Sequence, residues 1–162
     1  MKKPSLKNQR KIIVAISGGF DPIHIGHIRL INEAKALGDE LVVIMNNDHW
    51  LRAKKGYIFM PQKERKELLM ALSAVNKVIY TSHKKNTIYS NPLERSVVKE
   101  LTKLKPDIFA NGGDRFLDEI PENKLCKKLG IKMVFNIGKG GKIQSSSVLV
   151  GKAAKKNLSK YK

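Results

Sequence analysis

The chain has 162 residues, of which 41% are hydrophobic and 28% are charged, and its formal net charge is +18. This composition fits one globular domain and excludes an intrinsically disordered chain. The single cysteine, Cys126, excludes an internal disulfide framework and fits a reducing compartment, and no apolar run approaches membrane-spanning length. We therefore expect a soluble, cytoplasmic protein that does not contact membranes.

Much of the positive charge lies at the two ends of the chain. We expect a basic N-terminal tail over residues 1–10, one domain over residues 11–151 and a basic C-terminal tail over residues 152–162. A positive field of this kind attracts anionic nucleotides and phosphorylated metabolites, and it holds nucleic acid loosely. Aromatic residues make up only 6% of the chain and no zinc-ligand spacing occurs, so nucleic acid is expected only as a weak, non-specific partner.

Short apolar runs alternate with helical patterns along the chain. Strands are expected at residues 12–16, 40–45, 77–81, 107–110 and 131–136. Helices are expected over the apolar stripe from Ile28 to Leu37 with Gly38 as its cap, behind Pro61, after the Asn91-Pro92 pair, from Pro121 to Gly130, and after a serine cap at residues 145–147. This alternation predicts an α/β fold, a Rossmann-like doubly wound parallel sheet of about five strands with helices on both faces. Ligands of such sheets bind at the carboxyl ends of the strands.

The most informative segment follows the first expected strand and reads Gly18-Gly19-Phe20-Asp21-Pro22-Ile23-His24-Ile25-Gly26-His27. Glycines allow the backbone to approach a ligand closely, and a helix N-terminus offers free N–H groups and a positive dipole end. Gly26 leaves space between two imidazoles that can both donate to phosphate oxygens. The segment therefore predicts a nucleotide-phosphate site that uses Gly18, Gly19, Phe20, Asp21, His24 and His27.

The His-x-Gly-His motif after a Gly-x-Phe-Asp turn resembles the signature of the small cytidylyltransferase-like nucleotidyltransferases. These include glycerol-3-phosphate cytidylyltransferase, heptose-1-phosphate adenylyltransferase domains and archaeal FAD synthetase. The resemblance covers residues 11–150 and rests on several separate segments. It implies an enzyme that transfers CMP or AMP from CTP or ATP to a phosphorylated small molecule, with release of pyrophosphate.

Later segments resemble further parts of the family's site. Asn111-Gly112-Gly113-Asp114 resembles a loop that helps to hold the nucleotide, which implicates Asn111, Gly113 and Asp114. Ser145, Ser146 and Ser147 form an expected helix start and resemble a segment that contacts the triphosphate. Lys55 matches a loop lysine that reaches the triphosphate, and Asp48, Trp50 and Arg65 are candidate substrate-binding residues. His83 is interpreted as a surface residue and Cys126 as a core residue.

The expected catalytic residues are His24, His27 and Lys55, which would bind the phosphates and neutralise charge on the leaving pyrophosphate. Mg²⁺ is expected to bridge triphosphate oxygens without direct ligation by a protein side chain, and a homodimer is expected. The expected acceptor is a sugar or polyol phosphate. One alternative is an FAD synthetase-like or coenzyme adenylyltransferase, whose pocket would accept a flat ring system. Another is a non-enzymatic nucleic-acid-binding protein.

Overall fold

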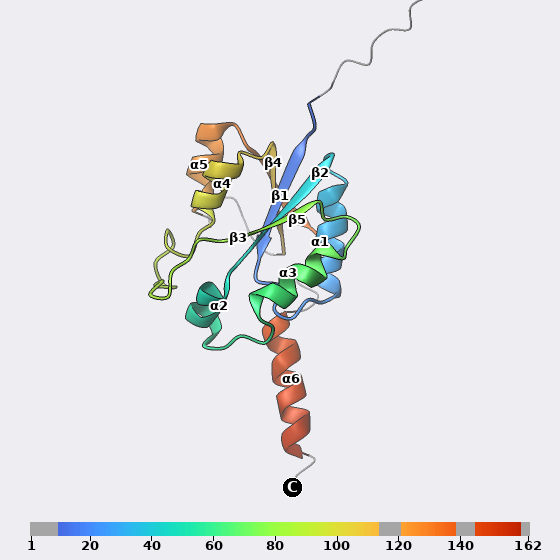
Figure 1. Ribbon diagram of the computed structural model, residues 1–162, viewed down its shortest axis with the longest axis vertical. Helices are drawn as coiled ribbons and strands as arrows, with labels where there is room; N and C mark the ends of the chain where they lie inside the picture. Colours follow the sequence, from blue (N-terminus) through green and yellow to red (C-terminus); the bar gives the residue numbers. More distant parts are fainter. Residues whose placement is uncertain (1–9, 114–120, 139–144, 160–162) are drawn as a thin grey trace, which may run out of the picture.

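The computed structural model describes residues 10–113, 121–138 and 145–159, and its side chains are described as far as residue 155 in the last range. Within these residues five strands form one parallel sheet in the order β3-β2-β1-β4-β5 (Figure 1). The strands are β1 (Ile13–Gly18), β2 (Glu40–Met45), β3 (Lys77–Tyr80), β4 (Ile108–Gly112) and β5 (Lys132–Ile137). The helices are α1 (Ile25–Lys35), α2 (Asp48–Lys55), α3 (Gln62–Met70), α4 (Val98–Leu104), α5 (Glu122–Leu129) and α6 (Ser146–Ser159). The predicted α/β Rossmann-like fold is confirmed.

Strands β1 and β2 are apolar along nearly their whole length because helices cover both faces of the sheet there. Successive side chains of a strand point to opposite faces, so Val14 and Ala15 belong to different halves of the core. Val14 lies in the cluster that α1 and α3 cover through Ile31 and Leu69. Ala15 lies in the cluster that α4 and α5 cover. Each fully buried aliphatic side chain of this size contributes about 1.5–3 kcal/mol, so the two clusters hold the sheet between two helical layers.

The strand order reverses between β1 and β4, which pair with each other although strands β2 and β3 come between them in the chain. A doubly wound sheet has its switch point at such a reversal, and loops leaving neighbouring strands there diverge to opposite faces. The loops after β1 and β4 therefore leave an opening between them at the carboxyl end of the sheet. This is where the predicted motif segments begin.

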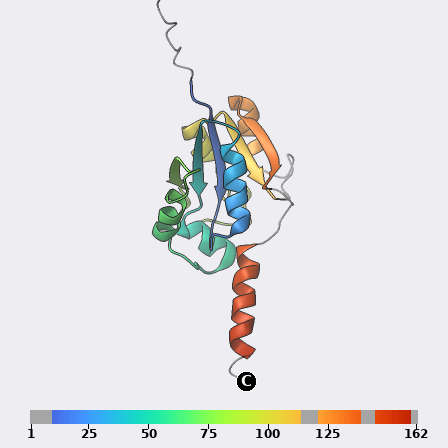
Figure 2. The ribbon, with the colours of Figure 1, turned by 90° about the vertical axis from the view of Figure 1, so that its right-hand side faces the viewer.

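Helix α6 extends away from the rest of the molecule, at the end opposite to the start of β1 (Figures 1 and 2). Its first turn is tied to the body by a hydrogen bond from Ser146 Oγ to the carbonyl of Pro22 at 2.9 Å. The helix continues through residue 151, so the predicted C-terminal tail begins inside it. No helix in the described ranges is long and apolar enough to cross a membrane.

Most expected elements occur within three residues of the expected positions, with two exceptions. Helix α2 was not expected, and it is capped by Asn47, whose side chain accepts from the amide of Trp50. The Asn91-Pro92 pair does not start a helix, because Asn91 instead accepts from the amide of Leu93 within a series of turns. Helix α4 begins later, at Val98, and has no side-chain cap. Cys126 is fully buried, as expected of a core residue.

Candidate active site

A cavity of about 500 Å³ opens at the switch point between β1 and β4. Its walls come from the β1–α1 turn, the start of α1, helix α2, the end of β4 and the start of α6. Among the residues singled out from the sequence, it is lined by Gly18, Gly19, Phe20, Asp21, His24, His27, Trp50, Lys55, Asn111, Gly113, Ser145, Ser146 and Ser147. The tertiary structure thus brings predicted residues from four separate segments into one cavity.

The two histidines stack at the N-terminus of α1, with ring centroids 3.8 Å apart. His24 is the N-cap residue, and its Nδ1 accepts from the amide of Gly26 at 3.1 Å. Nδ1 of His27 accepts from the amide of His24 at 3.3 Å. A neutral imidazole that accepts through Nδ1 carries its proton on Nε2. Both histidines therefore have the tautomer whose Nε2–H group can donate to a ligand in the cavity.

The surroundings of this pair favour the neutral imidazole. Burial lowers the pKa of His27 to about 3, with further lowering by His24 and Lys55. Burial also lowers the pKa of His24, and Lys55 acts in the same direction. Before an anion enters, the two rings are hydrogen-bond donors without a full charge, beside the positive end of the α1 dipole. An entering phosphate meets donors that are already oriented.

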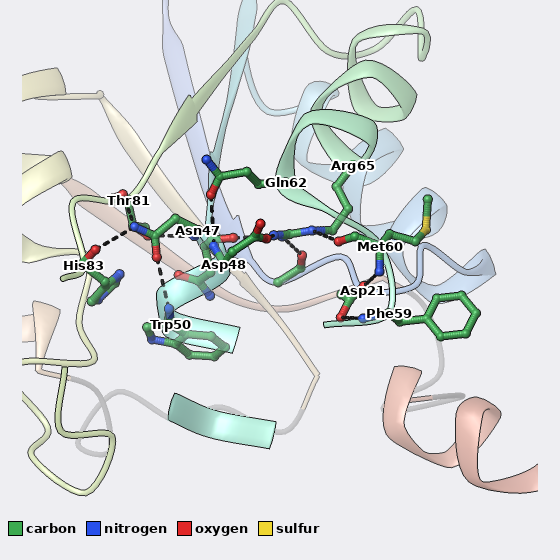
Figure 3. Close-up of polar contacts among 12 residues, drawn as sticks. Asp21, Asn47, Asp48, Trp50, Phe59, Met60, Gln62, Arg65, Thr81 and His83 are labelled. Carbon is green, nitrogen blue, oxygen red and sulfur yellow. Dashed lines mark hydrogen bonds and ion pairs between the residues drawn. The ribbon is translucent and has the colours of Figure 1, made fainter. Parts of the chain in front are cut away.

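Lys55, at the end of α2, is held against the β1–α1 turn. Its Nζ donates to the carbonyl of Asp21 at 2.6 Å and lies 3.9 Å from Asp21 Oδ2. The Asp21 carboxylate is itself fully buried and accepts from the amides of Phe59 and Met60 (Figure 3). Burial lowers the pKa of Lys55, Asp21 opposes that shift, and Arg65 adds to it. Asp21 thus positions the ammonium group at the cavity wall and fixes the loop that follows α2.

Protein side chains pack closely around the two glycines of the β1–α1 turn. A Cβ on Gly19 would lie 3.0 Å from Leu51 Cδ2, and a Cβ on Gly18 would lie 3.1 Å from the ring of Phe20. Phe20 has a φ of 52°, which is uncommon for a bulky residue, and its ring lies 4.9 Å from that of His27. The two glycines therefore make room for protein side chains that support the histidines, in addition to lining the cavity.

The far wall of the cavity carries an unused donor and a helix start. Asn111 is 4% exposed, and its Nδ2 atom is buried without a hydrogen-bond partner. A buried amide of this kind costs free energy unless a ligand or water accepts from it. Ser145 Oγ accepts from the amide of Val148, which confirms the predicted cap of α6. Asp114, the remaining residue predicted for this wall, lies outside the described residues.

A comparison with protein families matches residues 15–147 of the chain to the cytidylyltransferase-like family model, and this range includes every described segment that lines the cavity. The chain belongs to the cytidylyltransferase-like family. It is a nucleotidyltransferase, as the motif predicted, and this finding replaces the alternative of a non-enzymatic nucleic-acid-binding protein.

Relatives of this nucleotidyltransferase include curated and structurally characterised proteins. An FAD synthase of Methanosarcina mazei is 40% identical over 71% of this chain and 69% of its own length. An FAD synthase of Pyrococcus abyssi is 33% identical over 79% of this chain and 80% of its own length. A crystal structure of a lipopolysaccharide core biosynthesis protein from Thermoplasma volcanium matches with a TM-score of 0.62 at 28% identity, over 81% of this chain and 100% of that one.

Two of the residues predicted to bind substrate lie beneath the enzyme's cavity and do not line it. The Arg65 side chain is completely buried and donates from four of its five N–H groups, to the carbonyls of Met60, Gly19 and Asn46 and to Asp48 Oδ1 (Figure 3). Its bond to Asp48 measures 2.6 Å. A guanidinium with these partners ties β1, β2 and the loop before α3 together. The structure therefore assigns Arg65 and Asp48 a positioning role.

Trp50 does line the cavity, and the structure adds a neighbour that the sequence did not indicate. Trp50 is 6% exposed and meets Tyr89 edge to face, with ring centroids 5.5 Å apart. Lys54 lies over the Trp50 ring at 4.8 Å and also lines the cavity. The sequence could not indicate Lys54, because it is one of 32 basic residues. Only its position on α2, over the Trp50 ring, shows that it lies at the cavity.

The described part of the site offers no protein cage for a metal. Within the described residues, no group of three or more His, Cys, Asp or Glu side chains lies close enough to hold an ion. Among the described residues of the cavity wall, Asp21 supplies the one carboxylate, which is already bonded to two amides and lies near Lys55. The described residues fit a divalent ion best as one carried by the phosphates of a nucleotide.

Proposed function

We propose that this enzyme is an FAD synthase, which transfers the AMP group of ATP to the phosphate of FMN and releases pyrophosphate. The relatives named FAD synthase support this assignment, because they are 33–40% identical to the chain. It was the alternative in the sequence argument, and these relatives favour it over the sugar or polyol phosphate expected there.

The stacked histidines at the switch point are the observation that carries the chemistry. An oxygen of the acceptor phosphate, already anionic, attacks the α-phosphorus of the nucleotide, and the bond from that phosphorus to the pyrophosphate oxygen breaks. The Nε2–H groups of His24 and His27 donate to oxygens on the α-phosphate as charge develops there. Lys55, at the cavity wall, neutralises the departing pyrophosphate. Catalysis then consists of positioning and charge stabilisation, with no covalent enzyme intermediate.

The nucleotide's remaining contacts come from the far wall. The unpaired Nδ2 of Asn111 supplies one donor, and Ser145 to Ser147 place hydroxyl groups and the start of α6 at the same cavity. A helix start of this composition is suited to phosphate oxygens. The divalent ion enters with the triphosphate and shields its charge.

The aromatic wall supports a flat acceptor. Trp50 lines the cavity, and Tyr89 supports it from the side. The part of the indole that reaches the cavity offers a rigid apolar contact for a heteroaromatic ring such as the one in FMN.

A matrix of substrates tests the proposal. The purified chain is incubated with each of ATP, CTP, GTP and UTP and with FMN, riboflavin or a set of sugar and polyol phosphates, and pyrophosphate and FAD are measured. We expect pyrophosphate and FAD in equal amounts from ATP and FMN, and neither from riboflavin, which lacks the attacking phosphate. His24→Ala is the inactive control. Pyrophosphate release with a sugar phosphate and not with FMN would overturn the assignment.

A sugar phosphate acceptor is the second candidate because of one comparison. The Thermoplasma volcanium protein that matches this fold is named for lipopolysaccharide core biosynthesis, and it is 28% identical to the chain. The substrate matrix separates the two candidates in one experiment.

A further inference from the structure

A second cavity, of about 510 Å³, lies beside the active site between the β3–α4 connection and helix α4. None of the motifs found in the sequence falls in it. Its walls include Ser82, His83, Thr87, Ser96 and Glu100. The only one of these residues noted from the sequence was His83, and it was assigned to the surface. The structure instead leaves it partly exposed, with a buried Nδ1 atom.

The two cavities share a wall. Trp50 lines the active-site cavity, and its Nε1 donates at 3.0 Å to the carbonyl of Arg95, which lies between two residues of the second cavity, Glu94 and Ser96. On the same side, the Trp50 ring lies 6.4 Å from the ring of His83, which lines the second cavity (Figure 3). Trp50 therefore lies between the two cavities.

The second cavity is rich in hydrogen-bond acceptors. Three hydroxyl groups in its wall have already committed their protons: Ser82 Oγ donates to Glu100 Oε1 at 2.8 Å, Thr87 Oγ1 to the carbonyl of Lys84 at 2.8 Å, and Ser96 Oγ to the carbonyl of Leu93 at 2.7 Å. A hydroxyl whose proton is committed can only accept from a ligand. Glu100, 6% exposed, adds a carboxylate. These hydroxyl oxygens and the Glu100 carboxylate can therefore accept hydrogen bonds from donor groups of a ligand.

The charges of the two cavities differ. In the second, Lys84 and Lys99 are offset by Glu94 and Glu100. Among the described residues that line the active-site cavity, Lys54 and Lys55 are accompanied by a single carboxylate, that of Asp21, which is already bonded to two amides. A phosphate is therefore favoured in the first cavity, whereas the buried Glu100 carboxylate repels one in the second.

His83 adds an unsatisfied polar atom to this wall. Its Nδ1 is buried and makes no hydrogen bond. Burial lowers the pKa of His83, although Glu100 and the backbone of Ser96 and Glu94 oppose that shift, so the ring favours its neutral form. A neutral imidazole can donate to or accept from a ligand hydroxyl.

We propose that the second cavity binds the hydroxylated, uncharged part of the acceptor whose phosphate reacts in the first cavity, with Glu100 as the principal hydrogen-bond acceptor. This proposal rests on the enzyme's transfer of a nucleotide to a phosphorylated acceptor, as argued above. The ligand chemistry is a chain or ring of hydroxyl groups. The ribityl chain of FMN presents it, and so does a sugar or polyol phosphate.

The first test is the effect of Glu100→Gln on the Michaelis constants. The glutamine side chain keeps one oxygen that can accept from Ser82, but it lacks the negative charge and the second acceptor oxygen of Glu100. We expect KM for the acceptor to rise about tenfold or more, since hydrogen bonds to charged groups are the stronger ones, while KM for the nucleotide and kcat at saturation stay within about twofold. Lys103→Gln, an exposed change on the same helix, is the matched control and leaves both constants unchanged. An unchanged acceptor KM in Glu100→Gln, or an equal rise in both constants, would overturn the proposal.

The second test separates the hydroxyl groups from the ring by direct binding. Flavin fluorescence anisotropy compares riboflavin with lumiflavin, which has the same ring and a methyl group in place of the ribityl chain. We expect riboflavin to bind more tightly to the unaltered protein and expect Glu100→Gln to remove that advantage. Equal affinities in the unaltered protein would refute the hydroxyl site for a flavin acceptor.

The outcomes for the two proposals can be told apart. If pyrophosphate is released with a sugar phosphate and not with FMN, the FAD synthase assignment fails, and the second cavity is supported only if Glu100→Gln raises KM for that sugar phosphate. If FMN reacts and Glu100→Gln leaves its KM unchanged, the assignment stands and the second cavity is refuted. If no phosphorylated acceptor reacts, both fail.

Discussion

Protonation of His27 should destabilise the native protein, because burial holds its imidazole neutral. The pKa falls from 6.5, its ordinary value, to about 3 in the folded chain. Between these values the unfolded chain binds a proton that the native chain does not, so stability is full above pH 6.5 and is lost progressively as the pH falls toward 3. The expected slope is about 1.4 kcal/mol per pH unit in this window, and the loss at about pH 5 is about 2 kcal/mol.

The variant His27→Gln isolates this contribution. Glutamine is a natural residue at the third position of a helix, where its side chain can still accept from the amide of His24 as Nδ1 of His27 does. Urea unfolding of both proteins at about pH 7.5 and about pH 5 should show the unaltered chain losing about 2 kcal/mol more than the variant. In thermal unfolding, that difference corresponds to about 4–8 °C for a chain of this size.

The matched control is His49→Gln, since His49 is exposed on the same protein. It should lose as much stability between the two pH values as the unaltered chain does. Equal losses in His27→Gln and the unaltered chain would show that His27 is not held neutral by the fold, and the assignment of both imidazoles as uncharged donors would fail with it.

Three further variants test the site. His24→Ala should lower kcat by about 10²–10³ in the pyrophosphate assay with little change in the unfolding curve, because one donor to the developing charge is lost; turnover near that of the unaltered enzyme would contradict the mechanism. Gly26→Ala places a Cβ 3.0 Å from the His24 ring and should lower kcat about tenfold or more, whereas Gly151→Ala, which meets nothing within 4 Å, should leave kcat unchanged. Arg65→Met leaves three carbonyls and Asp48 without their donor and should lower the free energy of unfolding in urea by about 3–5 kcal/mol; a loss below about 1 kcal/mol would show that the buried guanidinium does not hold the loops together.

The sequence alone was sufficient for the fold and for the local arrangement of the two histidines. Strand and helix periods depend on neighbouring residues, so the alternation that predicted five parallel strands could be read directly from the chain. The pair His24 and His27 is likewise local, because both imidazoles lie in the first turn of one helix and their spacing places them side by side. The capping role of Ser145 follows from the same short-range geometry.

Contacts between distant segments were decided only by the tertiary structure. Arg65 and Asp48 carry the charges of substrate-binding residues, and nothing in the sequence shows that the guanidinium is buried against the carbonyl of Gly19, 46 positions away. Glu100 and His83 gained significance in the same way, because a cavity between β3 and α4 exists only once the sheet is packed. The sequence shows which groups can donate or accept, but burial and partners depend on which segments meet, and that is set by packing across the whole fold.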